Sequence, residues 1–542
     1  MRTQTDAKSN TIQSLLARLE QLNTVGAALS RERNINRVLE QILLAAKAIT
    51  HADGGTLYRM TEDGKSLRFE ILRTDSLNIW MGGTSGCAVG FPDIALLKQD
   101  GQPNDALVAA YAAIHGVTVN IPDAYEETDR FDFAGTRGFD ARTGYRSQSF
   151  LTVPMCDHEG AIIGVLQLIN AIDPKTHQVQ TFTDADQSLA ESLASQAAIA
   201  LSNRLLMTQL ENLFESFVGL INLAIDEKSP YTGGHCQRVP ELTMMLAEAV
   251  SATDSGPLAD FSLTDADRYE LKIAGLLHDC GKITTPVHVV DKATKLHTLF
   301  DRIALIDTRF EVLKRDTEIV ALREQLALRP VVQPDTESAI MKRSAETQAR
   351  LNEERDFLRK SNVGGEAMSD ADVACVRRIG TQHQWRNIDG VQADFLNADE
   401  MDNLCIRRGT LTSAEREIIN HHIVATIKML EKLPWPRHLK NVPEFAGGHH
   451  ERMDGKGYPK GLTREQMSVQ ARIMGIADIF EALTACDRPY KLGMKMSQAL
   501  GILEDFKRNG HIDPDLYDIF INSGIYRRYG KQFLNPEQLD VA

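Results

Sequence analysis

The sequence predicts a multidomain protein with an α+β sensor-like domain at the N-terminus, a long connecting helix, and a helical C-terminal domain that carries a large helical insertion. The chain has 542 residues, which is more than one ordinary hydrophobic core can hold. Short β-type runs mixed with helical segments extend to about residue 205. The predicted boundaries are 1–19 for an N-terminal helix, 20–205 for the α+β domain, 183–225 for the connecting helix, 212–500 for the C-terminal domain, 287–405 for its insertion, and 501–542 for a helical extension.

Composition excludes several classes of protein. A net charge of −14 argues against a general surface for nucleic acid or an anionic membrane, because both need a basic excess. It still permits a small anionic substrate, since metal ions can supply local positive charge. The seven cysteines are scattered and never spaced as CxxC, which is typical of a reducing compartment. With neither a signal region nor an apolar run of about 20 residues, the expectation is a cytoplasmic protein without a membrane span.

The pattern of the N-terminal region predicts a domain of the size of a sensor domain. An amphipathic stretch opens the chain, with apolar residues on helical spacing at Ile12, Leu15, Leu16, Leu19 and Leu22. The β-type runs that follow it are separated by turns and helices, and they include Gly55–Tyr58, Ser149–Pro154 and Ala161–Leu168. This mixture predicts an α+β fold.

A long helical pattern from Thr183 to about Ile225 comes next. Thr183 followed by Asp186 has the form of a capping box. Apolar residues then recur close to a coiled-coil period, at Leu189, Leu193, Ala197, Leu201, Leu205, Leu210, Leu213 and Phe217. The pattern predicts a helix that connects two domains and pairs with a second protomer, giving a homodimer. An ordinary core helix of the first domain is the alternative.

The region 287–405 differs from its surroundings. An amphipathic helix is predicted from Leu296 to Leu313, followed by a break at Arg329–Pro334 and a highly charged helical segment, Glu337–Lys360. A short helix is predicted after Ser369. Charged helices of this kind usually form a solvated hairpin or an oligomer contact, and nothing in them predicts catalysis.

The chemistry is concentrated in five histidines and two aspartates of the C-terminal half. They are His235 in YTGGHCQRV, His278 and Asp279 in LLHDCGK, His422 in EREIINHH, His449 and His450 in GGHHERMDGKGYP, and Asp478 in RIMGIADIFEALTACDRPY. Imidazole and carboxylate are ligands for Fe, Mn, Zn or Ni. Two adjacent histidines on a helix point about 100° apart, which suits two neighbouring metal ions. Each element alone is weak, but the whole set predicts a two-metal hydrolase.

These stretches resemble the HD-GYP domain, a bacterial subgroup of the HD phosphohydrolase superfamily. The resemblance covers about 212–286 and 405–500 and is most specific at HHERMDGKGYP. It implies an all-helical domain that hydrolyses cyclic di-GMP to pGpG and often on to GMP, with Fe or Mn as cofactor.

The resemblance also implies residue roles. It assigns metal binding to His235, His278, Asp279, His422, His449, His450 and Asp478. It makes Asp279 the bridge between two ions and places Lys282 at the scissile phosphate, so that these two are the catalytic residues. It assigns substrate contacts to Lys282, Gly457, Tyr458, Pro459, Arg488 and Lys491.

The chain departs from the family at several points. Members with three metals carry a glutamate four residues before the first histidine, where this chain has Tyr231. A dinuclear site is therefore expected, with Glu227 a poor substitute. Cys236 and Cys280 adjoin predicted ligands, and buried packing is favoured over a redox role. His421 is expected at the surface.

Residues 20–205 resemble a GAF domain, a small-molecule sensor. The resemblance is clearest in FLTVPMCDHEGAIIGVLQLINA and FTDADQSLAESLASQAAIAL. Asn170, Phe182 and Asp186 match a signature of cyclic-nucleotide-binding members, whereas Ala171 and Gln187 depart from it. Binding of a small ligand and a purely dimerising role both stay open. Cys87 lies in a loop without a bilin or haem attachment motif.

Three functional hypotheses follow. The first is a cyclic di-GMP phosphodiesterase in second-messenger signalling, regulated by the GAF-like domain. The second is a phosphodiesterase that prefers another cyclic dinucleotide, such as cyclic GMP-AMP. The third is a catalytically silent scaffold that binds nucleotide or a diguanylate cyclase partner. The complete ligand set argues against the third, because a scaffold has no use for every ligand.

Overall fold

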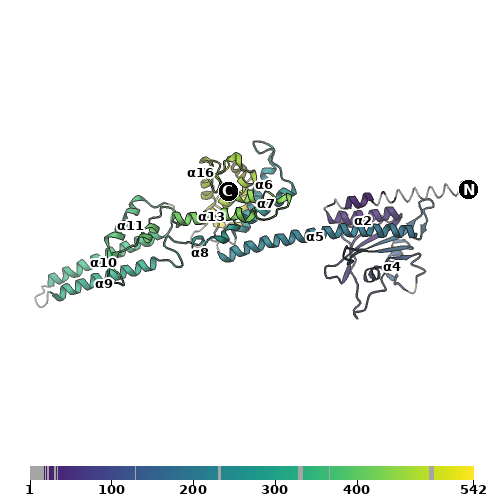
Figure 1. Cartoon of the computed structure of the whole chain (residues 1–542), viewed down its shortest axis with the longest axis horizontal. Helices are drawn as coiled ribbons and strands as arrows, with labels where there is room; N and C mark the ends of the chain where they lie inside the picture. The colour runs from purple at the N-terminus through teal and green to yellow at the C-terminus, as the bar shows by residue number, and fades with distance from the viewer. Residues whose placement is uncertain are drawn as a thin grey trace. The chain divides into compact units, whose positions relative to one another are not determined.

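The computed structural model describes residues 18, 20, 23–29, 32, 34–127, 130–229, 234–327, 334–364, 367–486 and 493–541. The chain divides into two compact units, Met1–Phe214 and Glu215–Ala542, whose elements are labelled in Figure 1. The predicted helix over 1–19 lies outside the described residues except for position 18.

The first unit is built on an antiparallel sheet. Its strands are β1 (Ala52–Met60), β2 (Ser66–Thr74), β3 (Ile79–Gly82), β4 (Ile94–Ala95), β5 (Val119–Ile121), β6 (Phe150–Cys156), β7 (Ile162–Ile172) and β8 (Val179–Gln180). The main path runs β3-β2-β1-β7-β6-β5, with β4 paired to β2 and β8 to β7. The three predicted β-type runs are confirmed as β1, β6 and β7, although β6 and β7 each begin one residue after the predicted start.

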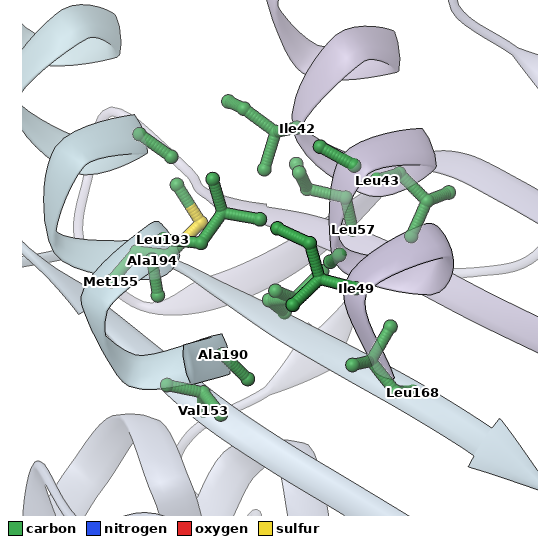
Figure 2. Packing of buried hydrophobic residues seen from close by; sticks show 14 of the residues in the cluster. Ile42, Leu43, Ile49, Leu57, Val153, Met155, Leu168, Ala190, Leu193 and Ala194 are labelled. Atoms are coloured by element: carbon green, nitrogen blue, oxygen red, sulfur yellow. The ribbon is translucent and has the colours of Figure 1, made fainter. Parts of the chain in front are cut away.

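Two cores lie on opposite faces of this sheet because successive side chains of a strand alternate. Helix α2 (Ile35–Thr50) and the start of α5 (Asp184–Lys228) pack on one face. Figure 2 shows Ile42, Leu43 and Leu193 from these helices against Leu57 and Leu168 of the strands. Helix α3 (Val108–His115) and two phenylalanines cover the other face. Helix α4 (Ala134–Thr143) completes this unit.

Local chemistry fixes where α2 and α5 begin. The Asn34 side chain accepts hydrogen bonds from the amides of Asn36 and Arg37 at the start of α2. At the start of α5, the Asp186 amide donates to Thr183 Oγ1, and Asp186 Oδ2 accepts from the Thr183 amide. The predicted capping box and the long connecting helix are both confirmed.

The second unit is mostly helical. Its helices are α6 (His235–Ser251), α7 (Asp265–Leu277), η1 (Cys280–Thr284), α8 (Val287–Val290), α9 (Ile303–Ala327), α10 (Pro334–Asn362), α11 (Asp370–Gln382), α12 (Ala398–Leu404), α13 (Ser413–Leu430), η2 (Arg437–Leu439), α14 (Val442–Gly447), η3 (Arg464–Gln466), α15 (Val469–Thr484), α16 (Met496–Arg508), α17 (Pro514–Asn522), α18 (Ile525–Phe533) and η4 (Pro536–Gln538). A small hairpin of β9 (Gln384–Arg386) and β10 (Gln392–Asp394) is an exception to the all-helical expectation. The C-terminal helices join the core, where Phe480 contacts the rings of Phe520 and Tyr529.

The insertion has a hydrophobic core of its own, in which α9 and α10 pair. The predicted helix over Leu296–Leu313 is wrong at its start, since α9 begins at Ile303. Asp301 accepts a hydrogen bond from the Ile303 amide and so ends the preceding loop. Leu296 is buried in the loop, but Phe300 is exposed. The short helix after Ser369 is confirmed as α11, with Ser369 as its cap. The predicted break falls mostly on 328–333, outside the described residues.

A buried ion pair links the start of the insertion to α13. Lys292 Nζ lies 2.7 Å from Glu415 Oε2 and also donates to Asn403 Oδ1, and the Lys292 side chain is only 1% exposed. Burial alone would raise the pKa of Glu415, but its bonds with Lys292 and Thr412 outweigh that effect and lower the pKa. This pair therefore stabilises the fold while Glu415 is ionised.

Glu415→Gln is expected to lower the free energy of unfolding by about 2 kcal/mol at pH 7, because it weakens a hydrogen bond to a buried charge. A carboxyl whose pKa is depressed by folding stabilises the folded state above its unfolded pKa of about 4.3, and that stability is lost as the pH falls through the folded value. The gap between wild type and variant in urea denaturation should therefore close below that range. Glu417→Gln, an exposed neighbour on α13, is the control, and an equal loss there would contradict the assignment.

Candidate metal centre

The predicted ligands come from five separate segments of the second unit. His235 is the first residue of α6, His278 is the C-terminal cap of α7, and Asp279 is the next residue, before η1. His422 lies within α13 and Asp478 within α15. His449 and His450 follow α14 in a turn. The expectation that this histidine pair lies on a helix is wrong, because α14 ends at Gly447.

Two packing contacts between helical segments bring the predicted ligands together. Helix α6 packs on α15, which sets His235 beside Asp478, with His235 Nε2 3.3 Å from Asp478 Oδ1. Segment η1 packs on α13, where the Gly281 amide donates to Thr426 Oγ1. A Cβ atom on Gly281 would lie 2.0 Å from the carbonyl oxygen of His422. Glycine at 281 is therefore required for Asp279 to approach His422.

Six of the seven predicted ligands form two adjoining trios, and Asp478 is in neither. His235, His278 and Asp279 make the first, and His422, His449 and His450 make the second; within each trio the potential ligand atoms lie within 4.8 Å of one another. His449 and His450 therefore belong to the same trio.

Asp279 lies between the trios. Its Oδ2 is 3.0 Å from His235 Nε2 and 3.2 Å from His278 Nε2, while its Oδ1 is 3.2 Å from His422 Nε2. Lys282 Nζ donates to Asp279 Oδ2 at 2.6 Å. One carboxylate thus faces both trios, which is the placement that a bridging ligand needs.

The histidines are oriented as metal ligands. In three of them Nδ1 bonds the carbonyl oxygen three residues earlier, which pairs His278 with Gly275 at 2.7 Å, His422 with Ile419 at 2.5 Å and His449 with Ala446 at 2.6 Å. A carbonyl only accepts, so Nδ1 carries the proton and Nε2 presents a lone pair to the centre.

Two ligand atoms of the centre lack protein partners. His449 Nε2 and Asp279 Oδ1 are buried without a hydrogen-bond partner among the described residues. The Nε2 atoms of His235 and His278 are 3.3 Å apart, and those of His422 and His450 are 3.2 Å apart. Ring nitrogens this close need a proton or a metal cation between them, so this donor set fits divalent metal ions.

The pKa values of the ligand side chains also favour metal binding. Burial lowers the pKa of His450 to about 4 and the pKa of His449 well below its usual value, so both are neutral at pH 7. Burial would raise the pKa of Asp279, but Lys282 and His278 outweigh it and hold that pKa well below its usual value. Burial likewise opposes a high pKa at His235, yet nearby carboxylates, Glu481 foremost, raise the pKa well above normal. The same negative field attracts a metal cation in place of a proton.

Glu481 and Arg238 belong to the centre but were not predicted from the sequence. Glu481 is fully buried; its Oε2 accepts from His235 Nδ1, and its Oε1 accepts from Arg238 Nε at 2.8 Å. A carboxylate behind a histidine ligand orients the ring and raises its basicity. The missed signal was spacing, since Glu481 lies three residues after Asp478, and Arg238 three after His235, on one helix face.

The loop after the histidine pair covers His450. The Tyr458 ring stacks on the His450 ring, with centroids 4.8 Å apart, and the Tyr458 amide donates to the His450 carbonyl. A Cβ atom on Gly457 would lie 2.4 Å from the Arg452 amide nitrogen. The buried Glu451 carboxylate accepts from the Lys460 amide further along the loop. Gly457, Tyr458 and Pro459 are thereby held beside the second trio.

The remaining residues singled out in the sequence are partly inside and partly outside the described part of the chain. Arg488, Lys491 and Tyr231 lie outside the described residues. Glu227 and His421 are exposed. Cys236 and Cys280 are buried, and burial raises the pKa of their thiols to about 12 and about 11 respectively. Both thiols are therefore protonated at neutral pH, in keeping with a packing role.

The three residues of the first unit that match the cyclic-nucleotide-binding signature have structural roles. Asn170 Oδ1 accepts from the amides of Gln148 and Ser149. Phe182 lies in the core under α2 and α5, and Asp186 caps α5. None of the three lines the cavity of about 320 Å³ on the opposite side of the sheet. The three residues that match the signature therefore contact other parts of the protein and not the cavity.

Comparison with protein families identifies both units. A GAF domain model matches residues 34–201, and two HD domain models match 232–344 and 397–516. The chain is a GAF domain followed by an HD domain. The two HD matches contain all seven predicted ligands, three in the first and four in the second. Residues 345–396, within the insertion, belong to neither match.

Several curated relatives of the chain are phosphodiesterases by name. A 3'3'-cGAMP-specific phosphodiesterase 3 of Vibrio cholerae is 35% identical over 151 residues, which are 28% of this chain and 30% of the relative. A cyclic di-GMP phosphodiesterase of Pseudomonas aeruginosa is 36% identical over 126 residues, 23% of this chain and 29% of the relative. The chain thus covers under a third of either relative. No helix in the described part of the chain is long and apolar enough to cross a membrane.

Proposed function

We propose that the HD domain hydrolyses the phosphodiester bonds of cyclic di-GMP, giving pGpG, GMP or both. The observation that carries this proposal is the single carboxylate of Asp279, which faces two trios of buried ligands while Lys282 donates to it. The relatives named as cyclic di-GMP phosphodiesterases support the choice of substrate.

Two divalent ions, Fe or Mn, are the proposed cofactors. His235, His278, Asp279 and Asp478 would hold one, and Asp279, His422, His449 and His450 the other. When bound, such ions neutralise charge on the phosphoryl oxygens and make water a better nucleophile at neutral pH. The ligands contain nitrogen and oxygen but no sulfur, which suits these metals.

The chain's own residues position the substrate and stabilise charge. Burial opposes the charged form of Lys282, yet the carboxylates of Asp279 and Asp478 raise its pKa, so its ammonium stays charged beside the centre. A fixed cation there stabilises negative charge as it develops on phosphorus oxygens. The stacked Tyr458 and the loop of Gly457 and Pro459 offer an aromatic surface and backbone groups to the nucleotide.

We propose that the GAF cavity takes a small, largely apolar or aromatic ligand rather than a nucleotide. Five phenylalanines line it: Phe69, Phe91, Phe133, Phe139 and Phe150. Its inner polar groups are already bonded within the protein, since Tyr58 Oη donates to Gln167 and Tyr145 Oη to Asp53. Arg142, the one arginine of the lining, is exposed. A phosphate would thus find no buried cation there.

The experiment is turnover of cyclic di-GMP and cyclic GMP-AMP by the full chain, purified without oxygen and loaded with Fe(II) or Mn(II). Chromatography should show loss of cyclic di-GMP, arrest by a chelator, and recovery after the metal is restored. Since three relatives are named for cyclic GMP-AMP, the ratio of the two rates decides the preferred substrate. If both substrates persist while about two ions are bound per chain, the proposed activity is wrong.

A further inference from the structure

The last turns of helix α5 belong to the second unit, which begins at Glu215. Three residues of these turns, Val218, Asn222 and Ile225, are at most 7% exposed. Their spacing of three or four residues places them on one face of the helix. Lys272 Nζ of α7 also lies 3.2 Å from Glu215 Oε2 of α5. The C-terminal end of α5 is therefore fixed on the unit that contains the metal centre.

The final residue of α5, Lys228, contacts the segment that carries Lys282. Its Nζ donates to the backbone carbonyl oxygen of Ile283 and, at 3.4 Å, to that of Lys282. Both carbonyl groups belong to η1. The Ile283 carbonyl lies in the last turn of η1, where carbonyl groups lack partners within the helix and attract a cation. Lys228 thus satisfies the end of η1 from α5.

A second hydrogen bond extends this contact along the chain. Ser229 Oγ donates to Asp291 Oδ1 at 2.5 Å, and Ser229 is buried. Asp291 directly follows α8, the helix after η1. Helix α13 holds the start of η1, through the hydrogen bond from the Gly281 amide to Thr426 Oγ1. Segment η1 is therefore held by α13 near its start and by α5 at its end.

The position of η1 determines where the Lys282 ammonium lies. Lys282 Nζ donates to Asp279 Oδ2 at 2.6 Å. Lys228 binds the carbonyl group of Lys282 itself and the next one, so a rotation of this turn would move the ammonium away from Asp279. We propose that Lys228 is a positioning residue, which acts through the main chain of η1 to keep Lys282 at the metal centre. This inference rests on the proposed phosphodiesterase activity.

Lys228→Met tests this role in the metal-loaded full chain, because it keeps the length of the side chain but removes the ammonium. Turnover of cyclic di-GMP should fall by about 10- to 10²-fold, since a displacement of about 1 Å can have that effect. The loss should be in kcat and not in KM, because Lys282 stabilises charge that develops in the transition state. Metal per chain should match the wild type, as every ligand is still present. Lys228→Arg keeps the charge and the donors, so it should recover most of the turnover.

Lys272→Met is the matched control. It makes the same chemical change and removes the ion pair between α7 and α5, but it removes no bond to η1. It should keep the kcat of the wild type. Equal losses of kcat in Lys272→Met and Lys228→Met would show that the docking of α5 matters and the bond to η1 does not. That result, or a normal kcat in Lys228→Met, would overturn the inference.

Hydrogen exchange gives a readout that does not depend on activity. The amides of Lys282 and Thr285 donate to the carbonyl oxygens of Asp279 and Lys282, so their exchange reports how firmly η1 is held. Both amides should exchange faster in Lys228→Met than in the wild type, and at the wild-type rate in Lys272→Met. Unchanged exchange in Lys228→Met would overturn the hold on η1. An inactive wild type with faster exchange in Lys228→Met would instead refute the phosphodiesterase activity and leave the hold on η1 standing.

Discussion

Asp279→Asn should abolish turnover of cyclic dinucleotide and release metal from the protein. The Asp279 carboxylate faces His235, His278 and His422 and accepts from Lys282. The amide keeps the size of the side chain but removes its negative charge and replaces one acceptor oxygen by a donor. We expect turnover to fall by at least about 10²–10³-fold, the cost of losing one charge-stabilising partner. Metal per chain, measured by elemental analysis, should fall with it.

A control separates this effect from unfolding. Asp260→Asn makes the same chemical change on an exposed loop between α6 and α7 and should leave both metal content and turnover unchanged. Circular dichroism should show the same helical content for both variants. An Asp279→Asn protein that retains normal turnover would refute the bridging role of Asp279.

Glu481→Gln should weaken metal binding without abolishing it. The Glu481 carboxylate accepts from His235 Nδ1 and pairs with Arg238, and it is fully buried. Glutamine can still accept the hydrogen bond but lacks the charge that makes His235 a more basic ligand. Loss of such a partner costs about 10–100-fold in metal affinity or activity. Competition with a chelator should show this loss, and excess metal should restore much of the turnover.

Recovery with metal distinguishes a positioning residue from a catalytic one. Asp279→Asn should not recover at any metal concentration, whereas Glu481→Gln should. Glu465→Gln, an exposed glutamate on η3, is the control and should bind metal like the wild type. Unchanged affinity in Glu481→Gln would show that the Glu481–His235 contact does not tune the centre.

The sequence predicted which side chains come together because histidine and aspartate carry their own chemistry. Histidine and aspartate in short motifs were sufficient to select His235, Asp279 and His422, although α6, η1 and α13 are far apart in the chain. Glu481 was missed because its importance comes from its contact with His235, 246 positions away. Such a contact depends on how α6 packs on α15, which no local pattern reveals.

Local patterns misled where tertiary structure overrides them. The periodicity from Leu296 to Leu313 suggested one helix, but Asp301 and the bond from the Leu296 amide to Asn362 Oδ1 hold the first residues in a loop. Asn170 matched a ligand-binding signature, and its side chain accepts hydrogen bonds from the amides of Gln148 and Ser149. Capping boxes were more dependable, as at Thr183 and Ser369, since all their atoms lie within four residues.

X-ray absorption with elemental analysis, on the full chain purified without oxygen, tests the central claim most directly. The two trios joined by Asp279 predict about two ions per chain, with nitrogen and oxygen neighbours only. A single ion per chain, or sulfur from Cys236 or Cys280 bound to the metal, would contradict the site described here.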